Sequence, residues 1–251
     1  MKKILANLIT GVGIFLFWET LIRCGFADPS LLPHPSTVLA KLGHEVTSAE
    51  FFLHLGSTLR LMLGGFFLAL LFGVPLGISL GLSRIIDSLL VFYVEFLRSL
   101  PAAALIPMFL VLFTGPIARI LVIGTACGAI IAIGSRSGVI SVNPIRREVA
   151  AILGWNFHEL FRKLLIWETI PAIALSARIA LSTSLILATV LEMLLGARYG
   201  LGDVLLSSMP TDKPRMYAII IILGMLGYLL NMLFKLVEWW LRRIGIYLTE
   251  K

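Results

Sequence analysis

"LMLGGFFLALLFGVPLGISLGLS", residues 61–83, is a run of 23 residues without a charged side chain. A helix needs about 20 mainly apolar residues to cross the hydrocarbon core of a bilayer. The run is continuously apolar and does not alternate between apolar and polar residues, and this favours a helix over a strand of a membrane barrel. The stretch therefore predicts a transmembrane helix.

The composition of the whole chain agrees with this assignment. The chain has 251 residues, of which 59% are hydrophobic and 14% are charged, and its mean hydropathy is +0.98. Soluble domains are nearer half apolar and a quarter charged. We therefore expect an all-α integral membrane protein in which residues 1–251 form one domain in the lipid bilayer. The net charge of +7 does not indicate a nucleic-acid partner, because Lys and Arg gather in the cytoplasmic loops of such proteins.

Five further apolar runs predict five more spans. The first run starts like a signal peptide but lacks a small-residue cleavage site, so we expect a retained helix. The third run is interrupted by Glu95, Arg98, Pro101 and Pro107 and has the least regular pattern. The six predicted transmembrane helices have the approximate bounds 4–23, 60–83, 88–113, 117–137, 171–195 and 216–238.

The distribution of basic residues predicts the orientation of these helices. With the N-terminus inside, eleven Lys and Arg residues fall in cytoplasmic segments and seven fall in external ones. This asymmetry favours cytoplasmic positions for both termini, and it makes the segment 138–170 cytoplasmic. Two external segments are expected to contain short helices, one beginning at Ser36 or Thr37 and one over residues 203–209.

The segment "EVAAILGWNFHELFRKLLIWETIPAI", residues 148–173, is charged and amphipathic in an otherwise apolar chain. Gly154 permits a turn after a short leading helix that starts at Glu148, and Pro171 suits a helix break or a first helical turn. Two interpretations stay open, a helix in the lipid headgroup layer and a docking helix for a cytoplasmic partner. The predicted apolar stripe, at helical spacing, comprises Leu153, Phe157, Leu160, Phe161 and Leu164.

The spacing of Glu148, Ala150, Gly154 and Pro171 resembles the EAA loop of importer-type ABC permeases. Val149 stands where the family has its first alanine, and the proline of the family's I-x-L-P pattern is absent. The resemblance implies a type I importer-like fold with a coupling helix between the fourth and fifth transmembrane helices.

The resemblance extends over nearly the whole chain to the nitrate/sulfonate/taurine branch of these permeases. It includes "LLPHPSTVL" at residues 31–39, "EFLRSLPAAALIPMFLVLF" at 95–113 and "LEMLLGARYGLGDVL" at 191–205. Ser99 occupies a position where this branch usually has proline. "FTGPIARI", residues 113–120, is shorter than the corresponding part of the family and has one glycine.

The resemblance also implies partners. These are a second permease subunit in a homodimer, two ABC ATPase subunits and an extracytoplasmic substrate-binding protein, in a bacterial cytoplasmic (inner) membrane. The implied substrate is a small anion, a sulfonate or a related small nutrient. The residues to which the resemblance assigns ATPase coupling are Glu148, Ala150, Gly154, Asn156, Phe157, His158, Glu159, Arg162 and Pro171.

The chain is expected to be a transport subunit and not an enzyme. It contains no G-x-x-x-x-G-K-[ST] motif, so ATP and Mg²⁺ are expected on the partner. We expect no catalytic residue, no cofactor and no metal on this chain. His34, His44 and His54 recur every ten residues, but on a helix this spacing rotates each side chain by about 80° from the last, so the three do not converge. A secondary transporter or channel without an ATPase is the main alternative, and an integral membrane enzyme is the other.

Polar groups at membrane depth are costly and often face a path or a partner. Structural pairing between helices is the alternative for each of them, and Glu95 and Arg98 are spaced to pair with one another. Gly73, Gly77 and Gly81 form a doubled G-x-x-x-G strip for close helix packing, either within the chain or at a subunit interface. The candidates for the translocation path are Arg98, Arg178, Ser182, Ser184 and Glu192.

Overall fold

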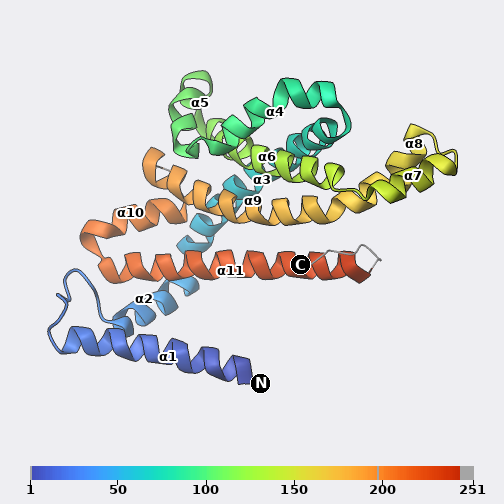
Figure 1. Cartoon of the computed structure of the whole chain (residues 1–251). Helices are drawn as coiled ribbons and strands as arrows, with labels where there is room; N and C mark the ends of the chain where they lie inside the picture. Colours follow the sequence, from blue (N-terminus) through green and yellow to red (C-terminus); the bar gives the residue numbers. More distant parts are fainter. Residues whose placement is uncertain (1, 197, 244–251) are drawn as a thin grey trace. The chain divides into compact units, whose positions relative to one another are not determined.

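The computed structural model describes residues 2–196 and 198–243, and every regular element in this part of the chain is a helix (Figure 1). The prediction of an all-α fold is confirmed. The helices are α1 (Lys2–Arg23), α2 (Pro35–Thr47), α3 (Ala49–Leu82), α4 (Arg84–Ser99), η1 (Ala102–Leu105), α5 (Ile106–Leu112), α6 (Gly115–Ile140), α7 (Pro144–Ile152), α8 (Phe157–Leu160), η2 (Phe161–Leu165), α9 (Ile166–Leu195), α10 (Leu201–Thr211) and α11 (Lys213–Arg243).

Four helical stretches of the described residues are long and apolar enough to cross a membrane. They are Ala49–Leu82, Gly115–Ile140, Phe157–Leu195 and Lys213–Trp239, and α4 with α5 adds a fifth if this bent pair is one span. These stretches overlap five of the six predicted spans, but their bounds differ, most of all for Phe157–Leu195 against the predicted 171–195. The predicted span 4–23 falls on α1, and the side chains of residues 1–8 lie outside the described part of the chain.

The third predicted span, 88–113, is not one continuous helix. Helix α4 ends at Ser99, and its axis makes an angle of 105° with the helical stretch that follows. Leu100 has φ −68° and ψ 137°, which is the extended conformation that a following proline imposes. Pro101 also lacks the N–H that would continue the helix. The prolines therefore divide this span.

The chain groups into two compact units, which are described separately. Residues 1–58 and 189–226 contribute to the first unit, and residues 59–188 and 227–251 to the second. The first unit has a core in which α3, α10 and α11 contribute apolar side chains. This core contains Phe51, Leu201, Val204, Ile219 and Ile222.

Ion pairs join α2 to the corner between α10 and α11 in the first unit. Lys41 Nζ lies 2.6 Å from Asp212 Oδ2, and Arg215 Nε lies 2.6 Å from Glu45 Oε1. Burial alone would raise the pKa of Asp212. The hydrogen bonds from Lys41 and from the Arg215 backbone N–H, together with the positive charges of these two residues, have the larger combined effect and hold that pKa below its usual value. Helix α2 begins at Pro35, one residue before the predicted start, and α10 contains the predicted 203–209 helix.

The second unit is built around α6, which packs against α3 and α9 at very short distance. A Cβ atom at Gly73 of α3 would lie 2.7 Å from the carbonyl oxygen of Gly128, and one at Gly81 would lie 2.5 Å from Val139 Cβ. On the other side of α6, a Cβ at Gly138 would lie 2.8 Å from Ala172 Cβ. Glycines thus bring the helices into backbone contact, as is typical of helix pairs in membranes.

Candidate coupling segment and intramembrane polar sites

Within the segment 138–170, a tight turn joins the short helix α7 to α8, which is the first turn of the helical stretch Phe157–Leu195. Asn143 caps α7, since its side chain accepts a hydrogen bond from the Ile145 N–H, and Pro144 occupies the first turn. Helix α7 ends where Gly154 has φ +70°, and the Trp155 N–H donates to the Ala150 carbonyl. Only glycine adopts this left-handed conformation readily. The predicted turn at Gly154 is present in the structure.

Helix α8 begins with a reciprocal pair of side-chain caps. The Glu159 N–H donates to Asn156 Oδ1 at 2.9 Å, and the Asn156 N–H donates to Glu159 Oε2 at 3.2 Å. This capping box satisfies two backbone donors at the helix start. Lys163 donates to Glu159 at 2.9 Å and lies over the Trp155 ring. The side chains of Asn156 and Glu159 therefore have a structural role of their own.

Two details of this segment differ from the prediction. The apolar residues do not form one stripe, because the turn at Gly154 separates Leu153 at the end of α7 from Phe157 at the start of α8. Pro171 is neither a break nor a first helical turn. It lies inside α9, and the helical stretch Phe157–Leu195 runs past it without interruption.

A salt bridge and a hydrogen bond connect α7 to the neighbouring helices of the second unit. Arg147 donates to the Val139 carbonyl near the end of α6, and Arg146 pairs with Glu168 of α9. Ala150 is buried at 3% exposure. The outer surface of the segment carries the exposed charged residue Glu148 together with exposed apolar residues. These apolar residues are Ile145, Val149, Ile152, Leu153 and Phe157.

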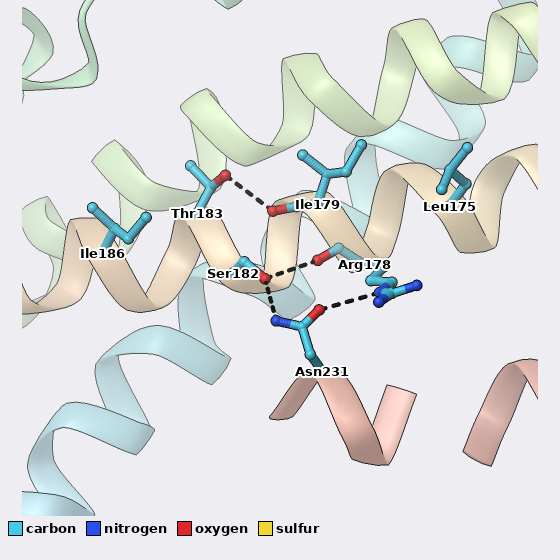
Figure 2. Close-up of a pocket in the computed structure, with 7 residues that line it drawn as sticks. All are labelled: Leu175, Arg178, Ile179, Ser182, Thr183, Ile186 and Asn231. Atoms are coloured by element: carbon cyan, nitrogen blue, oxygen red, sulfur yellow. Dashed lines mark hydrogen bonds between the residues drawn. The ribbon is translucent and has the colours of Figure 1, made fainter. Parts of the chain in front are cut away.

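A polar pocket of about 330 Å³ lies between α9 and α11 in the second unit (Figure 2). Arg178 Nε donates to Asn231 Oδ1 at 3.1 Å, and Asn231 Nδ2 donates to Ser182 Oγ at 3.0 Å. Arg178 Nη1 also lies 3.7 Å from Glu238 Oε1. Two predicted path residues of α9, Arg178 and Ser182, lie one turn apart and both hydrogen-bond Asn231 of α11. The pocket is lined by Leu175, Arg178, Ile179, Ser182, Thr183, Ile186 and Asn231.

The sequence prediction missed Asn231 and Glu238 as members of this polar network. The available signal was that Asn231 is the one amide side chain in the apolar run 216–234. A buried amide at membrane depth needs a hydrogen-bond partner on another helix. A run defined by the absence of charged side chains is not interrupted by an uncharged amide, so charge alone does not reveal Asn231.

The other predicted path residues occupy different surroundings. Ser184 is fully buried and donates to the Leu181 carbonyl of its own helix. Glu95 and Arg98 form the expected pair, with 2.7 Å between Oε2 and Nη2, and both side chains are nearly half exposed. Hence Arg98 lies at a surface of the described chain, whereas Ser184 is enclosed.

Glu192 is fully buried in the first unit and supports the start of α10. Its Oε2 accepts hydrogen bonds from Thr58 Oγ at 2.9 Å and from the Gly202 N–H at 3.0 Å. The Leu201 N–H donates in turn to Thr58 Oγ. A Cβ at Gly200 would lie 2.4 Å from the Glu192 carboxyl carbon, so only a glycine leaves room here. This geometry corresponds to structural pairing, the alternative that the sequence left open.

We expect Glu192→Ala to lower the free energy of unfolding by about 3 kcal/mol. The change leaves the buried Gly202 N–H without its acceptor, which costs about 1–3 kcal/mol, and it removes the Thr58 hydrogen bond, although the Thr58 hydroxyl keeps the His54 carbonyl as an acceptor. Thermal unfolding in detergent measures the effect. Glu192→Gln keeps one acceptor oxygen and is expected to lose roughly half as much. An unchanged melting temperature combined with altered transport would instead favour a path role for Glu192.

These features define a class of protein. Several long apolar helices, polar side chains within them and a short capped helix between two apolar spans are typical of a multi-pass transport protein of the inner membrane. The chain belongs to the family of binding-protein-dependent transport system inner membrane components, whose family model matches residues 73–243. The predicted relationship to ABC transporter permeases of the sulfonate/taurine/nitrate branch is confirmed.

Individual relatives and a solved structure agree with this membership. The chain is similar to SsuC of Bacillus subtilis, assigned as an aliphatic sulfonates transport permease protein, with 26% identity over 227 residues that cover 90% of this chain and 82% of SsuC. It is also similar to the taurine transport system permease protein TauC of Escherichia coli, with 28% identity over 207 residues that cover 80% of this chain and 75% of TauC. The inward-facing MetNI methionine ABC transporter contains a chain of the same fold, with a TM-score of 0.65, 21% identity, and coverage of 76% of this chain and 96% of that one.

Proposed function

We propose that this chain is the transmembrane subunit of an ATP-driven importer. It forms the translocation path as a homodimer with six transmembrane helices in each copy, both termini in the cytoplasm. Two ATPase subunits bind ATP and Mg²⁺ and dock on the segment 138–170, and an extracytoplasmic binding protein delivers the substrate. The observation that carries this proposal is the surface of α7 and α8, which presents apolar and charged side chains from a segment tied to α6 and α9.

The construction of this segment supports a role in transmitting force. Arg147 connects α7 to the end of α6, and Arg146 connects it to α9. A push on α7 is therefore passed to two membrane helices and is not absorbed by a flexible loop. Exposed apolar residues supply contact area for a partner, Glu148 and Arg162 supply charges that fix the register of docking, and His158 adds a polar ring on the same surface.

The substrate we propose is a small anion, a sulfonate or a related small nutrient. Relatives of this chain are permeases named for aliphatic sulfonates and for taurine. Two arginines, Arg98 and Arg178, lie in apolar helices of this chain, where they are suited to attract an anionic group. Arg98 is the more accessible of the two, at 47% against 30% exposure of the side chain.

Reconstitution tests this function. The chain is co-expressed with its ATPase subunit, purified through a tag on the chain and placed in lipid vesicles with the binding protein outside and ATP inside. We expect the ATPase to co-purify, and radiolabelled taurine or an alkanesulfonate to accumulate only when ATP is present. Uptake that follows an ion gradient without ATP, with no ATPase bound, would establish the alternative of a secondary transporter or channel.

A further inference from the structure

We infer that one face of α4 forms a wall of the water-filled translocation path and contacts a small polar solute there. This inference rests on the proposed transport function and specifies a surface within it. The face, here called the polar stripe, runs along the whole helix at intervals of four and three residues. The polar stripe consists of Arg84, Ser88, Val91, Glu95 and Arg98, with Ser99 beside it.

Helix α4 has three distinct faces, and only one of them is used inside the chain. Val94 is buried against Leu80 of α3 and against α6, and Ile86 and Leu97 pack on the same core. Residues three and four apart share one side of a helix. By this rule the polar stripe lies on a second side, beside the core, where Val91 and Glu95 are partly buried and Arg84, Ser88 and Arg98 are exposed. The third side is apolar and exposed, and consists of Ile85, Leu89, Phe92 and Phe96.

The charges of the polar stripe argue against contact with lipid. Glu95 and Arg98 pair at 2.7 Å, yet their side chains stay 42% and 47% exposed in the chain. Charged groups at membrane depth almost always face a cavity or another protein group. The helix has a different, fully apolar side that suits lipid well. The polar stripe is therefore the side of α4 that faces water.

The break after α4 provides an independent reason. Ser99 and Pro101 are exposed, and Leu100 is extended and outside any helix. Non-helical backbone at membrane depth is tolerated only where it is enclosed by protein or lines a water-filled cavity. Transporters place such broken helices next to their substrate sites. The polar stripe ends at this break, so both features belong to one polar surface.

This surface offers hydrogen bonds of both kinds to a solute. Ser88 and Ser99 donate to carbonyls of their own helix, and their hydroxyl oxygens keep lone pairs for a solute donor. Arg98 gives one Nη2–H to Glu95, and a guanidinium has five N–H donors in total. The remaining donors of Arg98 suit an anionic group of the solute.

Cysteine accessibility tests the inference. The parent carries Cys24→Ser and Cys127→Ala, which removes both native thiols. Single cysteines are placed in pairs at nearly equal depth: Ser88→Cys with Leu89→Cys, and Ser99→Cys with Phe96→Cys. All four positions are exposed in the chain itself, so a difference within a pair reports what surrounds the helix in the membrane.

The assembled transporter in lipid vesicles is treated with the anionic reagent methanethiosulfonate ethylsulfonate. We expect the thiols at positions 88 and 99 to react at least tenfold faster than those at positions 89 and 96, because an ionised thiol and a charged reagent meet only in water. The inference would be overturned if, in both pairs, the two thiols reacted at equal rates or the thiol at the serine position reacted more slowly. A second copy of the chain that covers the polar stripe would give this result. Only variants that still co-purify the ATPase are compared.

The parent without cysteines separates this inference from the proposed function. If the parent carries out ATP-driven uptake and the paired rates are equal, the importer stands and the assignment of α4 fails. If neither the parent nor the native chain binds an ATPase or moves a solute, the proposed function fails. The labelling rates are then read on the chain alone and decide only whether the polar stripe faces water.

Discussion

Gly154→Val is expected to reduce ATP-driven uptake at least tenfold. Gly154 has φ +70°, and an L-residue in the left-handed region costs about 1–2 kcal/mol, with β-branched residues affected most. Relief of this strain reorients α7 relative to α8 and so disturbs the surface that we propose docks the ATPase. A cost of this size corresponds to roughly a tenfold change in an equilibrium constant. Uptake and ATPase co-purification are measured together.

Gly154→Asn is the matched control for this change. Nothing lies within 4 Å of a Cβ at this position, so neither side chain meets a steric obstacle within the chain. Asparagine tolerates the left-handed conformation, and we expect it to retain most of the uptake. Equal activity of the valine and asparagine variants would show that the backbone turn does not determine coupling.

Gly77→Ala is expected to destabilise the chain by about 2–3 kcal/mol, which is at the upper end of the usual range for overpacking. A Cβ at Gly77 of α3 would lie 2.6 Å from Ser135 Cβ and closer still to the Ala132 carbonyl oxygen of α6. Backbone cannot move aside as a side chain does, so the two helices must separate. The expected result is a lower melting temperature in detergent and a loss of packing between α3 and α6.

Gly56→Ala is the corresponding control on the same helix. A Cβ at Gly56 would have no atom within 4 Å, and alanine is favoured over glycine in a helix by about 0.5–1 kcal/mol. We expect this variant to be as stable as the native chain or slightly more stable. A similar loss of stability in both variants would assign the effect to glycine content in α3 and not to the contact with α6.

The interruption of the third span shows how far local sequence rules reach. Pro101 and Pro107 indicated an irregular span, and the structure places the break at Leu100 because of the following proline. The angle of 105° follows from the packing of α4 and α5 on α6, which no local rule specifies. In the candidate coupling segment, likewise, Gly154 indicated the turn, but the periodic pattern suggested one apolar stripe where there are two helices.

The sequence by itself determined that this chain is a helical membrane protein of the ABC permease family. Long uncharged runs can be accommodated only by helices in a bilayer, because lipid offers no hydrogen bonds to an open backbone. This argument depends on length and composition, which are local properties. The EAA-like spacing around Gly154 is local as well.

The tertiary structure alone decided which polar groups meet. Thr58 and Glu192 are 134 positions apart, and Arg178 and Asn231 are 53 apart. Their contacts depend on how each helix is rotated about its axis and which neighbour it packs against. An apolar helix has little periodic pattern to indicate that rotation, because lipid and core favour the same side chains. Small residues such as Gly77 and Gly138 set these rotations through backbone contact, and the partners of the charged groups follow from them.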